Sequence, residues 1–263
     1  MLYEQSIVPP FLAWRINRAQ EWAKIIFNRE DIRASWSFMV DPTIPFSGGA
    51  RLRLLLQFYR ISLRVESPHR QSEILQFVAE ILRSKGGGQG AFVEAGCYKG
   101  GSAAKFSLAA WLAGRTLYLF DSFEGLPEND EQHGATIFGD YPNFTKEKYC
   151  GSIEEVKENI TRFGAIEVCG FVKGWFEDTM TNFREPLLGV YLDVDLASST
   201  RTCIKQLYPL LIPAGTLMSQ DGHLPLVINV FDDEAFWRDE VGVAKPVVKG
   251  LGQSKLISIR KLI

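Results

Sequence analysis

The chain has 263 residues, of which 46% are hydrophobic and 23% are charged, and its formal net charge is −2. This composition is ordinary for a globular protein and lacks the basic excess of nucleic-acid-binding proteins, so we expect no nucleic-acid partner. No segment reaches the roughly 18 apolar residues that a membrane-spanning helix needs, so we expect no membrane partner either.

Two further features predict a cytoplasmic protein. Residues 1–5 lack the charged and apolar regions of a secretory signal peptide. The four cysteines are widely spaced and form no Cys-x-x-Cys motif, which favours reduced thiols and argues against a structural zinc site. They are Cys97, Cys150, Cys169 and Cys203.

Residues 1–67 are predicted to form a helical N-terminal extension, because segments 11–29 and 51–64 have helical apolar spacing. Such an extension covers the core, forms a lid or joins subunits into a homo-oligomer, and the sequence does not choose among these. Residues 68–263 are predicted to form one α/β domain, which begins with an amphipathic helix over 68–84.

A glycine-rich turn follows the first predicted strand, at residues 91–102. The apolar run ends at Glu94, turns through Gly96 and Gly100, and opens a helix that Ser102 is placed to cap. This is the order of parts that holds a nucleotide-like cofactor on a strand-to-helix turn. The spacing Gly-x-x-x-Gly-Gly misses the dinucleotide fingerprint, so an ordinary strand-helix turn is the alternative.

An acid follows the second predicted strand, residues 116–120. Asp121 stands 121 − 96 = 25 residues after Gly96. In a doubly wound sheet this position lies beside the first glycine turn, where a carboxylate accepts hydrogen bonds from ribose hydroxyls. The alternative is an acid that caps a loop; the intact order of strand, turn, helix, strand and acid favours the ribose role.

Three other segments carry further candidates. A long polar insert to about residue 144 contains His133, which is either a surface histidine or, less favoured, a catalytic one. After a helix over 152–163 and a strand over 168–172, Trp175 and Phe176 either wall an adenine ring or pack in the core. His69, before the first helix of the domain, is interpreted as solvated or loop-anchoring, with a substrate contact as the alternative.

The fourth and fifth predicted strands, 187–192 and 216–219, also end in polar residues. Because the carboxyl ends of parallel strands meet in one crevice, acids there suggest an oxygen-ligand site for Mg²⁺. Such an ion would lower the pKa of a substrate hydroxyl; without it, Asp193 or His223 could act as the general base. The alternative is that these acids cap helices and line solvent. A helix over 225–240 and an antiparallel edge strand over 255–260, paired through 245–249, complete the prediction.

Four motifs resemble the macrocin O-methyltransferase family of S-adenosylmethionine (SAM)-dependent enzymes. They are residues 92–102, the run Asp-Ser-Phe-Glu-Gly-Leu-Pro at 121–127, the run Lys-Gly-Trp-Phe-Glu-Asp-Thr at 173–179, and residues 192–200. The resemblance spans roughly residues 68–223. It implies a Rossmann-like, doubly wound, mostly parallel seven-stranded sheet with an antiparallel last strand. The activity it implies is methyl transfer to a hydroxyl of a small molecule, often a sugar of a natural product, frequently aided by Mg²⁺.

The resemblance also assigns candidate residues. The cofactor-binding candidates are Glu94, Gly96, Gly100, Ser102, Asp121, Ser122, Gly174, Trp175 and Asp193. The candidate metal ligands are Asp193, Gln220 and Asp221. The family tends to place two adjacent acids at this position, whereas this chain has Gln220 followed by Asp221. The change removes one negative charge, so the sequence supports Mg²⁺ binding less strongly than SAM binding.

Two other functions compete with the O-methyltransferase. An NAD-dependent oxidoreductase also places an acid after the second strand, but its Gly-x-Gly-x-x-Gly turn is absent. A non-catalytic SAM-binding protein is the third reading, and Gln220 is its best support.

Overall fold

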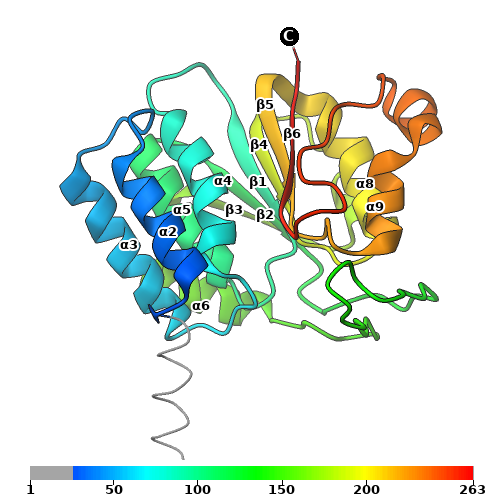
Figure 1. Ribbon diagram of the computed structural model, residues 1–263, viewed down its shortest axis with the longest axis horizontal. Coiled ribbons are helices and arrows are strands. Elements are labelled where there is room, and N and C mark those ends of the chain that lie inside the picture. The colour runs from blue at the N-terminus through cyan, green and yellow to red at the C-terminus, as the bar shows by residue number, and fades with distance from the viewer. Residues whose placement is uncertain (1–25, 263) are drawn as a thin grey trace, which may run out of the picture.

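The computed structural model describes residues 26–262. A central sheet is covered by helices on both faces (Figure 1). The predicted helical segment 11–29 lies mostly outside the described residues. Within the described part, no helix is long and apolar enough to cross a membrane.

The sheet has the order β3-β2-β1-β4-β5-β6, in which β1 to β5 are parallel and β6 runs antiparallel to β5. The strands are β1 (Ala91–Ala95), β2 (Leu117–Asp121), β3 (Cys169–Lys173), β4 (Leu187–Leu192), β5 (Leu211–Ser219) and β6 (Ile257–Arg260). This confirms the Rossmann-like, doubly wound fold and its antiparallel last strand.

The sheet formed by residues 26–262 has six strands, and the expectation of seven is wrong for this part of the chain. Segment 245–249 contributes only an isolated bridge, between Lys249 and Ser258. Pro246 lacks the amide hydrogen that a longer ladder would need. Gly250 and Gly252, both at positive φ, then turn the chain toward β6.

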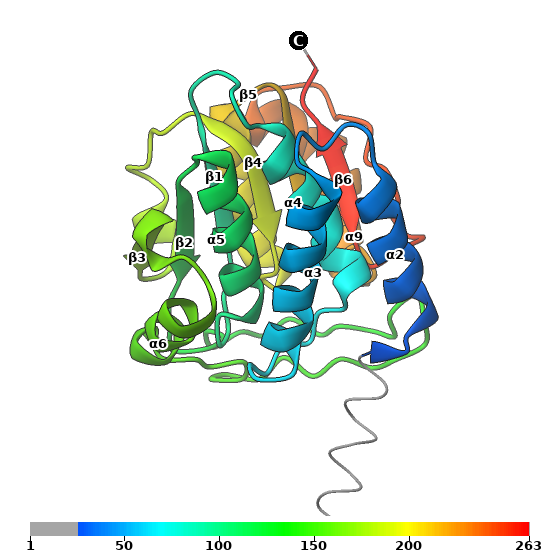
Figure 2. The ribbon, with the colours of Figure 1, turned by 90° about the vertical axis from the view of Figure 1, so that its left-hand side faces the viewer.

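Helices pack in two layers on one face of the sheet. The inner helices are α4 (Gln71–Arg83), α5 (Gly101–Ala113) and α6 (Ile153–Phe163). The described part of the N-terminal extension forms α2 (Arg29–Val40) and α3 (Gly48–Ser62), which pack on the outside of α4 and α5 (Figure 2). Short 3₁₀ turns at Ile166–Val168 and Tyr208–Leu210 precede β3 and β5.

The opposite face is covered by α7 (Phe176–Thr179), α8 (Ala197–Leu207) and α9 (Pro225–Asp232). A π-helical turn, Phe236–Val241, replaces the last part of the helix that was predicted over 225–240. The reason is local: Asp233 has extended backbone angles, and its carboxylate accepts the amide hydrogen of Phe236.

Strand β1 shows why the sheet is buried on both faces. All five of its residues are buried, and alternate side chains point to opposite sides. Phe92 packs with the α4 and α5 layer, whereas Val93 packs with the α8 and α9 layer. Burial on both faces explains the apolar run over 91–93 that the sequence predicted, and Glu94 is the one charged residue of the strand.

An aromatic cluster joins α4 and α5 to the sheet. The ring of Phe77 lies 5.7 Å from that of Phe92, 5.0 Å from that of Phe106 and 5.3 Å from that of Tyr191. All four residues are almost fully buried.

Replacing Phe77 with Ala should remove the centre of this cluster and leave a cavity. We expect a loss of about 3–5 kcal/mol in the free energy of unfolding, measured by urea denaturation. Leu56→Ala, on the exposed side of α3, should change it by less than about 0.5 kcal/mol. Equal effects of the two substitutions would contradict this account of the core.

Candidate functional site

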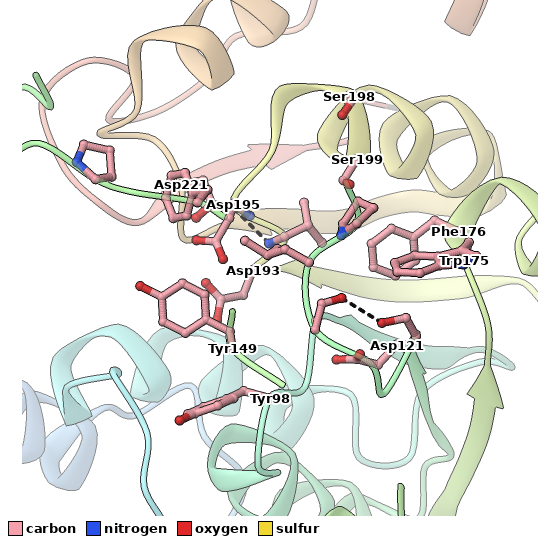
Figure 3. Close-up of a pocket in the computed structure, with 18 of the residues that line it drawn as sticks. Tyr98, Asp121, Tyr149, Trp175, Phe176, Asp193, Asp195, Ser198, Ser199 and Asp221 are labelled. Atoms are coloured by element: carbon pink, nitrogen blue, oxygen red, sulfur yellow. Dashed lines mark hydrogen bonds between the residues drawn. The ribbon is translucent and has the colours of Figure 1, made fainter. Parts of the chain in front are cut away.

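A cavity of about 540 Å³ lies at the carboxyl ends of the parallel strands. It opens where β1 and β4 are neighbours and the loops that follow them diverge, the usual ligand position in a doubly wound sheet. Figure 3 shows Asp121, Trp175 and Phe176 on one side and the acids Asp193 and Asp221 on the other. The sequence predicted that these segments meet, and the structure brings them together.

The turn after β1 needs a glycine at its first position. Gly96 has a φ of +87°, and a Cβ built on it would lie 1.9 Å from the carbonyl oxygen of Asp193. The amide hydrogens of Gly96 and Asp193 are donated to Phe120 and Ala95, which fixes both backbones. The close approach therefore joins the two halves of the cavity wall.

Asp121 binds the backbone of the same turn and also lines the cavity. Its two carboxylate oxygens accept the amide hydrogens of Cys97 and Phe123, at 2.6 and 2.7 Å. Burial raises the pKa of Asp121, and these amide hydrogen bonds oppose the rise. Asp121 therefore makes the backbone contacts that the loop-capping interpretation expects. Hydrogen bonding of its remaining lone pairs to ribose stays a prediction.

Ser122, Gly174 and Trp175 line the same side of the cavity as Asp121. The hydroxyl of Ser122 donates to the carbonyl of Gly125 and holds the start of the insert. Trp175 is 37% exposed. Exposure of an indole at a cavity wall favours a ligand-stacking position over core packing.

Tyr98 and Tyr149 were missed by the sequence analysis. Both line the cavity, and their rings meet edge to face with centroids 5.9 Å apart. Tyr98 lies inside the glycine turn, so the sequence could have identified it as a cavity residue. Tyr149 lies between the insert and α6, where the sequence offers no periodicity to place a side chain.

Four predicted site residues do not line this cavity: Glu94, Gly100, Ser102 and Gln220. Glu94 is fully buried in β1, neither of its oxygens has a hydrogen-bond partner, and burial raises its pKa well above the ordinary value. Gly100, at φ +79°, is itself the N-cap of α5, so Ser102 lies within the helix and does not cap it.

Asp221 and Asp195 stand beside Asp193 at the ends of β5 and β4. One oxygen of Asp221 accepts the amide hydrogens of Val194 and Asp195, at 3.0 and 3.2 Å. Burial, and then the charge of Asp193, raise the pKa of Asp221 to about 7. Burial and the charge of Asp221 raise the pKa of Asp195 well above its ordinary value.

His69 contacts Asp193, which the sequence analysis did not foresee. Its Nε2 lies 2.8 Å from the Oδ2 of Asp193, and its side chain is 3% exposed. Its Nδ1 is hydrogen-bonded to the hydroxyl of Ser67 at 3.0 Å. Burial raises the pKa of Asp193, but His69, Lys255 and His223 together lower it below its ordinary value, with His69 contributing most of the lowering.

The other two histidines differ in position. His223 lines the cavity, stacks on Phe138 with centroids 6.0 Å apart, and has a pKa lowered by burial to about 4. It is therefore neutral at pH 7. His133 lies 3.2 Å from Glu131 and does not line the cavity; its side chain is 2% exposed, so the expectation of a surface histidine is wrong.

The arrangement does not fit the predicted magnesium ligands. Gln220 is fully buried, and its Oε1 accepts the hydroxyl hydrogen of Tyr191 at 3.1 Å, away from the cavity. One oxygen of Asp193 is paired with His69, and one oxygen of Asp221 already accepts two amide hydrogens. Across residues 26–262, no three His, Cys, Asp or Glu residues are grouped to hold a metal ion.

Solved structures share this fold. The O-methyltransferase NovP has a TM-score of 0.61 and 21% sequence identity, and the alignment covers 81% of this chain and 99% of NovP. The calicheamicin methyltransferase CalS11 has a TM-score of 0.56 and 15% identity, over 88% of this chain and 91% of CalS11. The fold is therefore that of the Rossmann-like methyltransferases.

The macrocin-O-methyltransferase (TylF) family model matches residues 67–249. The chain therefore belongs to this family of SAM-dependent O-methyltransferases. A relative in Streptomyces olivaceus, 8-demethyl-8-(2,3-dimethoxy-alpha-L-rhamnosyl)-tetracenomycin-C 4'-O-methyltransferase, is 29% identical over 66% of this chain and 67% of its own length. Demethyldecarbamoylnovobiocin O-methyltransferase of Streptomyces niveus is 29% identical over 58% of this chain, and the match spans only 59% of that enzyme.

Gly96→Ala should destabilise the fold as well as the site. The added Cβ meets backbone at 1.9 Å, so we expect a loss of more than about 3 kcal/mol in the free energy of unfolding. Gly114→Ala is the matched control, because Gly114 also has a positive φ but a Cβ there meets no described atom within 4 Å. It should cost only about 1–2 kcal/mol. Urea denaturation of both variants checks this, and similar losses would show that backbone strain alone, without the contact, sets the effect.

Proposed function

We propose that the chain transfers the methyl group of SAM to a hydroxyl of a sugar or glycosylated natural product. The observation that carries this proposal is the shared cavity, which is lined by Asp121 at the end of β2 and by Asp193 at the end of β4. The side of the cavity that would bind the cofactor, at Asp121, thus meets the side that would carry out the methyl transfer, at Asp193. They meet at the position where doubly wound folds bind ligands. The names of the two Streptomyces relatives support the acceptor class.

On the cofactor side, the turn at Gly96 brings backbone close to the cavity, and Asp121 offers carboxylate lone pairs to ribose hydroxyls. Trp175 offers an aromatic surface on which a base can stack. Glu94 and Ser102 are buried and do not line the cavity, so we assign them no contact with the ligand.

On the chemical side, SAM supplies an electrophilic methyl group when it is bound. The work left to the protein is to hold the acceptor oxygen in line and to take up its proton. Asp193 is the proposed general base, because it lines the cavity and its lowered pKa keeps it ionised at neutral pH. His223 is the alternative base, since it is neutral at pH 7 and lines the same cavity.

The first experiment compares thermal stabilisation by SAM, S-adenosylhomocysteine and NAD, followed by turnover of a panel of glycosylated acceptors. Stabilisation by NAD alone would favour the oxidoreductase. Binding of SAM without turnover of any acceptor would favour a non-catalytic SAM-binding protein.

The division into an extension, 1–67, and a catalytic domain, 68–263, stays a proposal. In the described part, α2 and α3 contribute no residue to the cavity wall, which begins at Pro68 and argues against a lid formed by these helices. Their outer surfaces carry exposed apolar side chains at helical spacing, as a contact between subunits would need. These are Ile32, Trp36, Val40, Leu52 and Leu56.

Asp121→Ala should weaken SAM binding about 10- to 100-fold, because hydrogen bonds to a charged partner contribute roughly 1.5–3 kcal/mol. Asp121 also accepts hydrogen bonds from the backbone of the turn. A ligand that lacks one ribose hydroxyl separates its role in ribose binding from its role in holding the turn. Calorimetry with S-adenosylhomocysteine and its 2′-deoxy analogue should show a preference in the wild type that the variant has lost. A preference that survives in the variant would assign Asp121 to the turn alone.

Asp193→Asn keeps the shape of the side chain and removes its charge. Turnover should fall by about 10²–10⁴-fold, while the calorimetric affinity for SAM barely changes. His223→Ala, measured in parallel, should leave turnover largely intact. The opposite result, in which only His223→Ala abolishes turnover, would make His223 the base.

A further inference from the structure

We propose that His69 is a positioning residue for Asp193 and stands where a divalent cation would otherwise neutralise this carboxylate, so that the site works without a metal ion. The metal-binding part of this inference stands on the geometry alone. The catalytic part rests on the proposed function.

The contact between His69 and Asp193 is the first observation. The imidazole is buried, and its Nε2 lies 2.8 Å from Oδ2 of Asp193. It is held from both sides, because Nδ1 is hydrogen-bonded to Ser67 and the ring packs edge-on against Tyr191, with centroids 6.2 Å apart. A buried carboxylate needs such a partner, and a metal ion would have to displace it to use the same oxygen.

The second observation concerns Gln220, the position at which the chain departs from two adjacent acids. The hydroxyl of Tyr191 donates to Oε1 of Gln220, so the only ligand-capable oxygen of this side chain is engaged on the far side of the strand end. Tyr191 therefore contacts both His69 and Gln220. The histidine and the glutamine therefore pack on the same tyrosine, and two oxygens that a metal ion would need, Oδ2 of Asp193 and Oε1 of Gln220, are already engaged.

The third observation is a cation of the chain itself on the cavity wall. Lys255 lines the cavity beside Asp193 and Asp221. Its position is set by its carbonyl, which accepts the amide hydrogen of Gly222 at 3.0 Å. The charge of Lys255 acts on both Asp193 and Asp221, so it repels a second cation and supplies part of the positive charge that the acids need.

Every bond and proton of the methyl transfer is accounted for in this arrangement without a metal ion. The acceptor oxygen forms a bond to the methyl carbon, the bond from that carbon to sulfur breaks with its electron pair on sulfur, and the hydroxyl proton passes to Asp193. His69 holds Oδ2 and leaves Oδ1 of Asp193 to receive the proton. His69 itself does not line the cavity, so its effect on the reaction passes through Asp193.

The first test measures Mn²⁺ binding by electron paramagnetic resonance. Mn²⁺ is the only metal ion added, and S-adenosylhomocysteine is present. We expect no saturable binding to the wild type at millimolar Mn²⁺, and a gain of one site in a variant that combines His69→Ala with Gln220→Asp. Calorimetry with S-adenosylhomocysteine shows that each protein is folded and keeps its cofactor side. Saturable binding of one Mn²⁺ by the wild type would overturn the proposal.

The second test uses an acceptor that is turned over. Wild-type turnover should be the same in EDTA and in Mg²⁺. His69→Leu should lower kcat about 10- to 100-fold with little change in KM for SAM. His69→Gln, whose amide can still donate near the position of Nε2, should recover most of kcat.

Glu66→Gln is the matched control, because it removes the 2.6 Å pair between Glu66 and Lys99, which anchors the same loop. It should leave kcat unchanged. If Glu66→Gln lowers kcat as much as His69→Leu does, His69 only anchors the loop and the positioning role is wrong. A chain that fails to bind S-adenosylhomocysteine would refute the proposed function instead, and the Mn²⁺ result would still stand.

Discussion

The close approach of Gly96 to the carbonyl of Asp193 is the constraint on which the site depends. Strands β1 and β4 are neighbours at the centre of the sheet, and their loops leave in opposite directions. Because no side chain fits between the two backbones, the turn after β1 must pass directly beside the end of β4. The carboxylate of Asp121 accepts the amide hydrogen of Cys97 in this turn. The contact therefore also fixes the position of Asp121 relative to Asp193. Cofactor and chemical residues are thus positioned by backbone geometry.

The same arrangement buries several carboxylates, and each is stabilised in a different way. Asp121 and Asp221 accept backbone amide hydrogens, whereas Asp193 is paired with His69. Glu94 has no hydrogen-bond partner, and burial raises its pKa well above the ordinary value. Among these four carboxylates, Asp193 alone has a lowered pKa.

Much of this site follows from the order of strands and polar residues along the chain. Gly96, Asp121, Asp193 and Asp221 could be placed because parallel strands end at one edge of the sheet. The contact between His69 and Asp193 could not, since it joins residues 193 − 69 = 124 positions apart and depends on how one loop packs. Gln220 has the right atoms for a ligand, but the hydroxyl of Tyr191 decides where its oxygen points. Similarly, helical spacing continues past Asp233, although a local side-chain contact ends the α-helix there.

The choice of base among the cavity residues is decided more by position than by base strength. Asp221, with a pKa of about 7, is the stronger base, but one of its oxygens is already held by two amide hydrogens. His223 and Asp193 are both weak bases at neutral pH. Methyl transfer makes the acceptor oxygen strongly acidic as the new bond forms, so a weak base in the right place suffices. In the proposed mechanism, a carboxylate that is kept ionised and held by His69 meets that requirement, and it needs no metal ion to lower the pKa of the hydroxyl beforehand.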